Sequence, residues 1–130
     1  MIMQLRLTIF ILLLSVVLMA FQCRKEGVNT RSFKGRLEIK GMCSNYTIKV
    51  LDGPVDTTQI QANWTDPSTG KAYQNVFGLG SPCTFPADIN EGDEFYFVLA
   101  NEPQNCAVCM AFYPTPSRRL NIKVSKTPIQ

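Results

Sequence analysis

A two-residue alternation of apolar and polar side chains is the feature that most constrains what this chain can fold into. From Phe33 onward the alternation recurs over residues 36–40, 46–50 and 60–64. A period of two places successive side chains on opposite faces of a strand, whereas a helix repeats every 3.6 residues, and no window sustains the helical period. We therefore predict that these three segments are strands with one solvated face.

Three later segments, residues 94–100, 107–113 and 120–124, are also predicted to be strands. The first two carry apolar residues on both faces, which is typical of central strands. Clusters of Gly, Pro, Asn, Asp and Ser separate the predicted strands at residues 52–54, 66–70, 81–82, 90–93 and 114–116. Several short strands punctuated in this way predict one all-β domain, either a closed barrel or a sandwich.

One stretch carries a resemblance to a known fold. Residues 89–97, Ile-Asn-Glu-Gly-Asp-Glu-Phe-Tyr-Phe, form a glycine-acid turn that leads into an apolar strand. This stretch is similar to one that recurs in OB-like and related small barrels, so the resemblance implies a small OB-like β-barrel. The alternative is an immunoglobulin-like β-sandwich, in which Cys43, Trp64 and Cys106 would take the cysteine, tryptophan and cysteine positions. That class has a tyrosine two residues before the last cysteine, where this chain has Gln104.

The amino-terminal segment is predicted to be an export signal. Arg6 precedes an apolar stretch over residues 7–21 that only Thr8 and Ser15 interrupt. Fifteen helical residues span about 22 Å, less than the roughly 30 Å of a bilayer core, so we expect cleavage rather than a permanent span. The predicted organisation is a signal peptide over 1–22, a tether over 23–33 and a single all-β domain over 34–130.

The residues around the expected cleavage site resemble the lipobox of bacterial lipoproteins. Residues 18–23 read Leu-Met-Ala-Phe-Gln-Cys, and the polar Arg-Lys-Glu follows. The resemblance implies that Cys23 is lipidated and that the protein is anchored in the bacterial outer membrane, on its periplasmic or surface face. Each buried acyl methylene contributes about 0.8 kcal/mol, so several chains hold a protein on a membrane without a spanning helix. The alternative is cleavage after Ala20, which would release a soluble secreted protein.

Four cysteines lie in the predicted domain, and an even number in an exported domain predicts two disulfides. The favoured pairing joins Cys43 to Cys83 and Cys106 to Cys109, because the second pair is local. The local pair requires a bend, since residues three apart in a flat strand lie about 10 Å apart and a disulfide needs Cα atoms about 5.5 Å apart. In a regular strand, Cys106 and Cys109 would pair with Cys43 and Cys83 instead.

Catalytic chemistry finds little support in the composition. The chain has 13 basic and 10 acidic residues and no histidine, so it lacks the commonest general base and metal ligand. The net charge of +3 does not favour nucleic acid as a partner. We expect no enzymatic activity, no cofactor and no metal; a zinc site would usually need a second closely spaced cysteine pair. A redox alternative uses Cys106 and Cys109, which have the spacing of thiol-disulfide oxidoreductases, although no helix is predicted to follow them.

By elimination, the sequence predicts a binding or scaffolding module that is monomeric. Trp64 and Tyr73 flank the predicted turn at 66–70 and are candidates for an exposed aromatic surface that binds a protein or a carbohydrate. The alternative places Trp64 on the inward face with Ile60 and Ala62. A further alternative is a protease inhibitor, in which a rigid disulfide-held loop blocks an enzyme.

Overall fold

The structure is a computed structural model of the 130-residue chain. It describes residues 1, 3–4, 32–54, 56–102 and 104–128. Cys23, most of the predicted signal peptide and most of the predicted tether therefore lie outside the described residues. Within those described ranges, no helix is long and apolar enough to cross a membrane.

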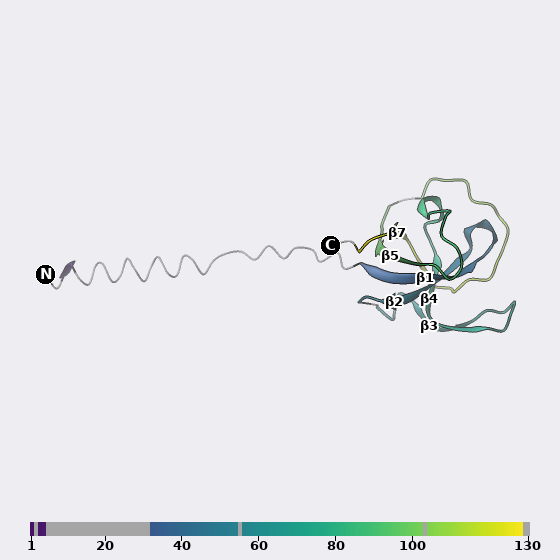
Figure 1. Cartoon of the computed structure of the whole chain (residues 1–130), viewed down its shortest axis with the longest axis horizontal. Coiled ribbons are helices and arrows are strands. Elements are labelled where there is room, and N and C mark those ends of the chain that lie inside the picture. Colours follow the sequence, from purple (N-terminus) through teal and green to yellow (C-terminus); the bar gives the residue numbers. More distant parts are fainter. Residues whose placement is uncertain (2, 5–31, 55, 103, 129–130) are drawn as a thin grey trace.

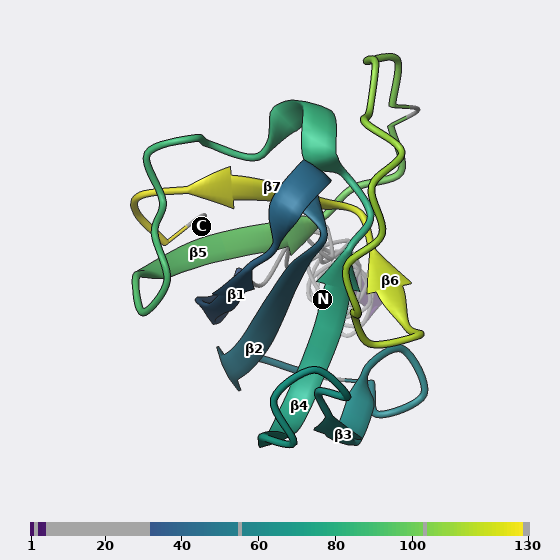
Figure 2. The ribbon, with the colours of Figure 1, turned by 90° about the vertical axis from the view of Figure 1, so that its right-hand side faces the viewer.

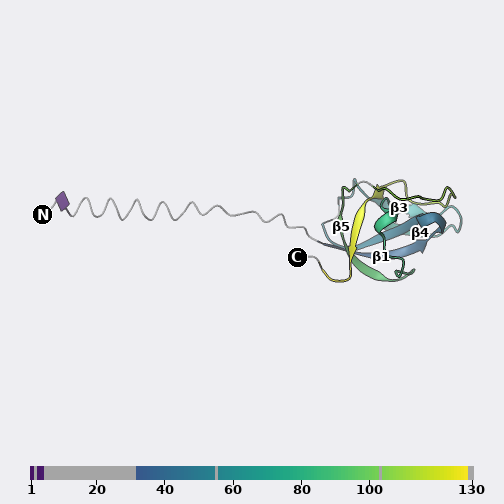
Figure 3. The same ribbon diagram turned by 90° about the horizontal axis from the view of Figure 1, so that it is seen from above.

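The described residues from Phe33 onward form seven strands and two short 3₁₀ helices (Figures 1 and 2). In chain order they are β1 (Phe33–Lys40), η1 (Met42–Ser44), β2 (Tyr46–Asp52), β3 (Gln61–Thr65), β4 (Ala72–Leu79), η2 (Pro82–Thr84), β5 (Glu94–Leu99), β6 (Arg119–Leu120) and β7 (Ile122–Ser125). The strands form one sheet in the order β3-β4-β2-β1-β5-β7, and β6 pairs with β4. All neighbours are antiparallel except the parallel pair of β4 and β6. Figure 3 shows these strands gathered in one body.

The end of the chain contacts two distant parts of the sheet. β6 pairs with β4, β7 pairs with β5, and only Asn121 separates β6 from β7. The ladder is not continuous across Asn121, so the sheet is open. The all-β fold class is confirmed, while the choice between an OB-like barrel and a sandwich stays a prediction.

The core lies on one face of the long strands, where the alternation predicted it. Leu37 and Ile48, partners across β1 and β2, are fully buried, and so are Phe77 of β4 and Phe97 of β5. The buried cluster comprises Leu37, Ile48, Val50, Ile60, Phe77, Leu79, Phe95, Phe97 and Ile122. A side chain of this type contributes about 1.5–3 kcal/mol when it is fully buried, so burial of this cluster stabilises the sheet.

Two of the predicted strands need correction, and one strand was not predicted. The segment 107–113 is not a strand; it has no regular structure and most of its side chains are exposed. The segment 120–124 contains a break at Asn121, and β4 was missed altogether. The residues of β4 from Val76 to Leu79 are all buried, so the strand lacks the alternation that identifies a half-buried one.

A buried serine fixes the position of β7. The Ser81 hydroxyl donates to the carbonyl of Ile122 at 2.9 Å and accepts from its N–H at 2.8 Å. Two backbone bonds continue the contact, from Gly80 N–H to Leu120 O and from Ala100 N–H to Asn121 O. The two ends of the long segment between β5 and β6 are therefore held to the sheet.

Candidate functional site

The segment between β5 and β6, residues 100–118, is the most unusual part of the domain, and we call it the braced loop. Figure 2 shows it in light green, extending beyond the strands. Its residues carry no regular secondary structure in the described part, which excludes residue 103. Because a loop of this length without secondary structure is uncommon in a small domain, it is a candidate for function.

Two disulfides fasten the braced loop to the two 3₁₀ helices. Cys43 of η1 pairs with Cys109, and Cys83 of η2 pairs with Cys106, with Cα–Cα distances of 5.3 and 5.6 Å. Two disulfides are thus confirmed, but the favoured pairing of Cys43 with Cys83 and Cys106 with Cys109 is wrong. The physical reason is that the chain does not bend back at residues 106–109. Instead, Cys106 pairs with Cys83 of η2, and Cys109 pairs with Cys43 of η1.

This pairing bears on the redox and metal hypotheses. Cys106 and Cys109 do not form the local disulfide that a thiol-disulfide oxidoreductase of this spacing would need. All four sulfurs are held in disulfides. Among the described residues, no group of three or more His, Cys, Asp or Glu side chains is placed to hold a metal ion.

Large apolar side chains project from the braced loop and from the turn bonded to it. Val108 is 53% exposed, Met110 96% and Phe112 85%, while Met42, next to the disulfide-bonded Cys43, is 60% exposed. We call these four residues the apolar tip. Sequence analysis assigned Val108, Met110 and Phe112 to a central strand, so their exposure is a correction. Val108, Met110 and Phe112 line a common pocket, and Met42 is next to Cys43 of the same pocket lining, so these exposed apolar side chains are a candidate interaction surface.

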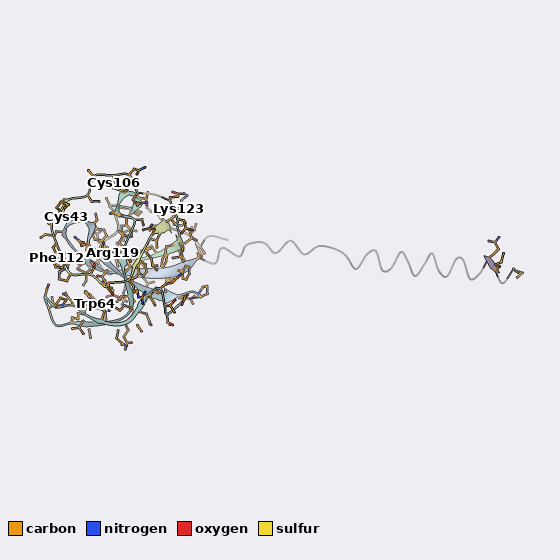
Figure 4. All side chains as sticks on the ribbon, turned by 180° about the vertical axis from the view of Figure 1, so that it is seen from behind. Cys43, Trp64, Cys106, Phe112, Arg119 and Lys123 are labelled. Atoms are coloured by element: carbon orange, nitrogen blue, oxygen red, sulfur yellow. A yellow bond between two sulfur atoms is a disulfide. The ribbon has the colours of Figure 1, made fainter. Side chains whose placement is uncertain are left out.

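A pocket of about 280 Å³ lies beside the apolar tip. Val108, Met110 and Phe112 line one side, and Leu79, Pro82 and Arg119 contribute to the remainder. The pocket is large enough to receive one or two side chains of a partner. Figure 4 shows that Cys43 and Phe112 lie at the same end of the domain.

Among the described residues that line this pocket, Arg119 is the only charged one. Its guanidinium donates to the carbonyl of Leu79 at 3.4 Å, to Oδ1 of Asn45 at 3.4 Å and to Oγ1 of Thr115 at 3.0 Å. All three acceptors are neutral. The ion pairs among the described residues are Lys34–Glu94, Arg36–Glu38 and Lys126–Asp88. Arg119 therefore has no carboxylate partner within the described part of the chain.

The turn that joins β1 to β2 is held in an uncommon conformation. Cys43 and Ser44 both have φ of 58°, in the left-handed region that glycine usually occupies. The side-chain amide of Asn45 donates to the carbonyls of Met42 at 2.9 Å and Ala111 at 3.0 Å. Such a conformation persists where its surroundings determine it. The disulfide and the Asn45 bonds supply that constraint, so the turn and the braced loop hold each other in place.

The predicted aromatic surface has a different location, on the β3–β4 hairpin. Trp64 and Tyr73 are cross-strand partners, and their ring centroids lie 5.7 Å apart. The ammonium of Lys71 lies 4.9 Å from the centroid of Tyr73. Ala62 is exposed, so the expectation that it shares a buried face with Ile60 and Trp64 is wrong for Ala62. A ligand-binding role for Trp64 and Tyr73 stays a prediction.

Comparison with protein-family models, with curated proteins and with solved structures finds no match. The site is therefore defined by its geometry alone. Sequence analysis missed Met42 and Arg119 as functional candidates. The available signal was a run of large apolar residues next to closely spaced cysteines, which also fits a buried strand.

Proposed function

We propose that this protein is an exported, lipid-anchored binding module that holds a protein partner at the apolar tip. The observation that carries the proposal is the exposure of four large apolar side chains on a surface fastened by two disulfides. Disulfides form and persist in oxidising, extracytoplasmic compartments. The lipobox-like stretch that ends at Cys23 supports an anchor in the bacterial envelope.

The energy available at the apolar tip fits a binding role. A fully buried side chain of this size contributes about 1.5–3 kcal/mol, so burying the exposed parts of four contributes on the order of 5–9 kcal/mol. Association itself costs about 4–15 kcal/mol. The apolar tip can therefore support binding, provided that it is already ordered and that the partner makes further contacts.

The two disulfides hold the braced loop in an ordered conformation before any partner binds. Cys43–Cys109 closes a sequence separation of 66 residues, and Cys83–Cys106 closes one of 23. A loop that is already fixed in its bound conformation loses little conformational entropy on binding. The disulfides thus support recognition as well as stability.

The position of the apolar tip favours a protein over the anchoring membrane. The tether would enter at Phe33, which pairs with Phe97, and Phe97 in turn pairs with Val124 of β7. Met42 follows the opposite end of β1, a strand roughly 23 Å long at about 3.3 Å per residue. Figure 4 shows Cys43 and Phe112 at one end of the domain and Lys123 toward the other. The apolar tip thus lies far from the point where an anchored chain would leave the domain.

Site-specific photocrosslinking in the native host tests the proposal. A photoreactive amino acid at Phe112 should give a discrete adduct with another protein. The same residue at Thr57, an exposed position in the β2–β3 connection, serves as the control and should give none. Adducts with lipid alone at Phe112, or equal adducts at both positions, would contradict the proposal.

The anchor is tested separately by the intact mass of the protein from the host membrane fraction. Cleavage before Cys23 with added acyl chains is the expected result. A mature protein that begins after Ala20 and carries no acyl chain would contradict lipid anchoring. Binding at the apolar tip would then still be tested by the crosslinking experiment.

One observation favours inhibition of a protease as a second candidate function. Met110 is 96% exposed and directly follows Cys109 in a loop that two disulfides constrain. Such a loop can occupy an active site without being ordered on binding. The proposal predicts a one-to-one complex in a protease panel that Met110→Gly weakens; no inhibition of any protease would exclude it.

A further inference from the structure

The guanidinium of Arg119 is the one charged group among the described residues that line the pocket, so its charge bears on which partner can bind there. We infer that the apolar tip recognises a protein segment in which an apolar side chain lies next to a carboxylate, and that Arg119 binds this carboxylate. The inference rests on the proposed function, because it specifies the chemistry of the partner at the same surface.

The donors of Arg119 are not all used. A guanidinium has five N–H groups. Arg119 donates one hydrogen bond from Nη1 and two from Nη2, at distances of 3.0–3.4 Å. Within the described residues, Nε and the second N–H of Nη1 are therefore available to a ligand. Each of these N–H groups can donate one charge-assisted hydrogen bond to a carboxylate.

The neighbours of Arg119 hold its head group at the pocket. Asn45 and Thr115, which accept hydrogen bonds from Nη2, come from the β1–β2 turn and the braced loop. These bonds connect the guanidinium to the two segments that the Cys43–Cys109 disulfide joins. The position of the charge relative to the apolar tip is thus set before a partner binds.

The charges around the pocket favour an acidic partner. The lining residues that the structure describes include no Asp and no Glu, so an incoming carboxylate meets no like charge from them. A partner that covered the apolar tip would also remove water from Arg119. Leaving a cation desolvated and unpaired is unfavourable, so a partner without a carboxylate at this position would bind less well.

The size and place of the pocket favour a protein segment over the other acidic, apolar candidates. A volume of about 280 Å³ fits one or two side chains. An anionic lipid surface shares the chemistry, but the apolar tip follows the end of β1 that lies opposite Phe33. A second copy of this chain would have to present an acidic, apolar segment to the same pocket, and it would appear as a dimer.

Peptide selection on the mature protein, in the form that its host makes and with disulfides intact, tests the inference. Random dodecapeptides should yield sequences with Asp or Glu within two residues of a large apolar side chain. Changing that acid to its amide should weaken binding to the native protein about tenfold or more, because hydrogen bonds between charged groups are the stronger class. When the peptides bind the Arg119→Gln variant, the same change from acid to amide should weaken binding less than about threefold, because the variant lacks the cation.

Arg118→Gln is the matched control. Arg118 is also exposed and cationic, but it does not line the pocket. This variant should keep the preference for acid. Unchanged thermal unfolding and an unchanged disulfide count should show that Arg119→Gln folds normally, as expected for an exposed side chain.

Several outcomes would overturn the inference. The selected peptides could lack Asp and Glu, the preference for an acidic peptide could persist in the Arg119→Gln variant, or no peptide could be selected at all. Binding to phosphatidylglycerol vesicles that depends on Arg119 would assign the site to lipid, and a dimer lost in Phe112→Ser would assign it to a second copy. If Phe112 still crosslinks to a protein in any of these cases, the proposed function stands and only the acidic partner is refuted. If neither crosslinks nor peptides appear, both fall.

Discussion

The buried hydroxyl of Ser81 allows a sharp prediction about stability. Ser81 is fully buried, and its hydroxyl forms both the donor bond and the acceptor bond with the backbone of Ile122. Ser81→Ala removes the hydroxyl and leaves a buried N–H and a buried carbonyl without partners. An unsatisfied buried group costs about 1–3 kcal/mol, so we expect Ser81→Ala to lower the free energy of unfolding by about 2–4 kcal/mol.

Urea unfolding with the disulfides intact measures this loss. Trp64 is the single tryptophan of the chain and packs against Tyr73, so its fluorescence should report unfolding. At an m value of about 2 kcal/mol per molar urea, which is typical of small domains, the midpoint should fall by roughly 1–2 M at constant m. The variant should stay folded in water, because small domains are stable by about 5–15 kcal/mol.

Ser117→Ala is the control for the same chemical change at the surface. Ser117 is exposed, and its hydroxyl lies 3.3 Å from Oε1 of Gln61. Exposed substitutions of this kind stay within about 0.5 kcal/mol. A loss below about 1 kcal/mol in Ser81→Ala, or equal shifts in the two variants, would refute the assignment of Ser81 as the link between β7 and the sheet.

Three further predictions concern the turn, the disulfides and one carboxylate. Gly41→Ala should destabilise the domain by about 1–3 kcal/mol in thermal unfolding, because the added carbon would overlap the backbone of the β1–β2 turn. Serine at both Cys43 and Cys109 should cost about 4 kcal/mol in the chain-entropy model and abolish crosslinking at the apolar tip; unchanged crosslinking would show that the loop needs no brace. The pKa of Asp56 should lie below 3.8 because Thr58 donates side-chain and backbone hydrogen bonds to it, so the associated stabilisation is present above pH 3.8 and is lost as pH falls through the lowered pKa. Thr58→Val should raise that pKa toward 3.8 in a carbon-13 titration.

Part of the sheet could be predicted from the sequence because β1, β2 and β5 each bury side chains that alternate with more exposed ones. The alternation around Leu37 and Ile48 corresponds to β1 and β2, and the apolar run that ends at Leu99 corresponds to β5. β4 escaped prediction because its second half is enclosed. Phe77 and Leu79 lie in the core, while a side-chain carbon at Gly78 would meet Thr115, Pro116 and Arg119. This half of β4 is therefore covered on both faces and carries no period of two.

The candidate site could not be predicted in the same way, because its residues are defined by distant partners. The apolar run that contains Val108, Met110 and Phe112 reads like a central strand. Only the pairing of Cys106 and Cys109 with two separate turns shows that this segment is held outside the sheet. The isolation of Arg119 likewise depends on which acidic residues lie nearby in space, which sequence spacing does not reveal.

The exposure of the apolar tip follows from how the braced loop is fastened. The core beneath β1, β2, β4 and β5 is already filled, so the domain gains little by folding these side chains inward. At the base of the loop, the ring of Tyr113 packs against Gly41 so closely that a side-chain carbon there would lie 2.8 Å from it. Together with the Cys43–Cys109 disulfide, this contact holds the chain on both sides of Met110 and Phe112, whose side chains are exposed. Under the proposed function, a partner that covers Met110 and Phe112 would supply the apolar burial that these side chains lack within the domain, and the disulfides would serve recognition as well as stability.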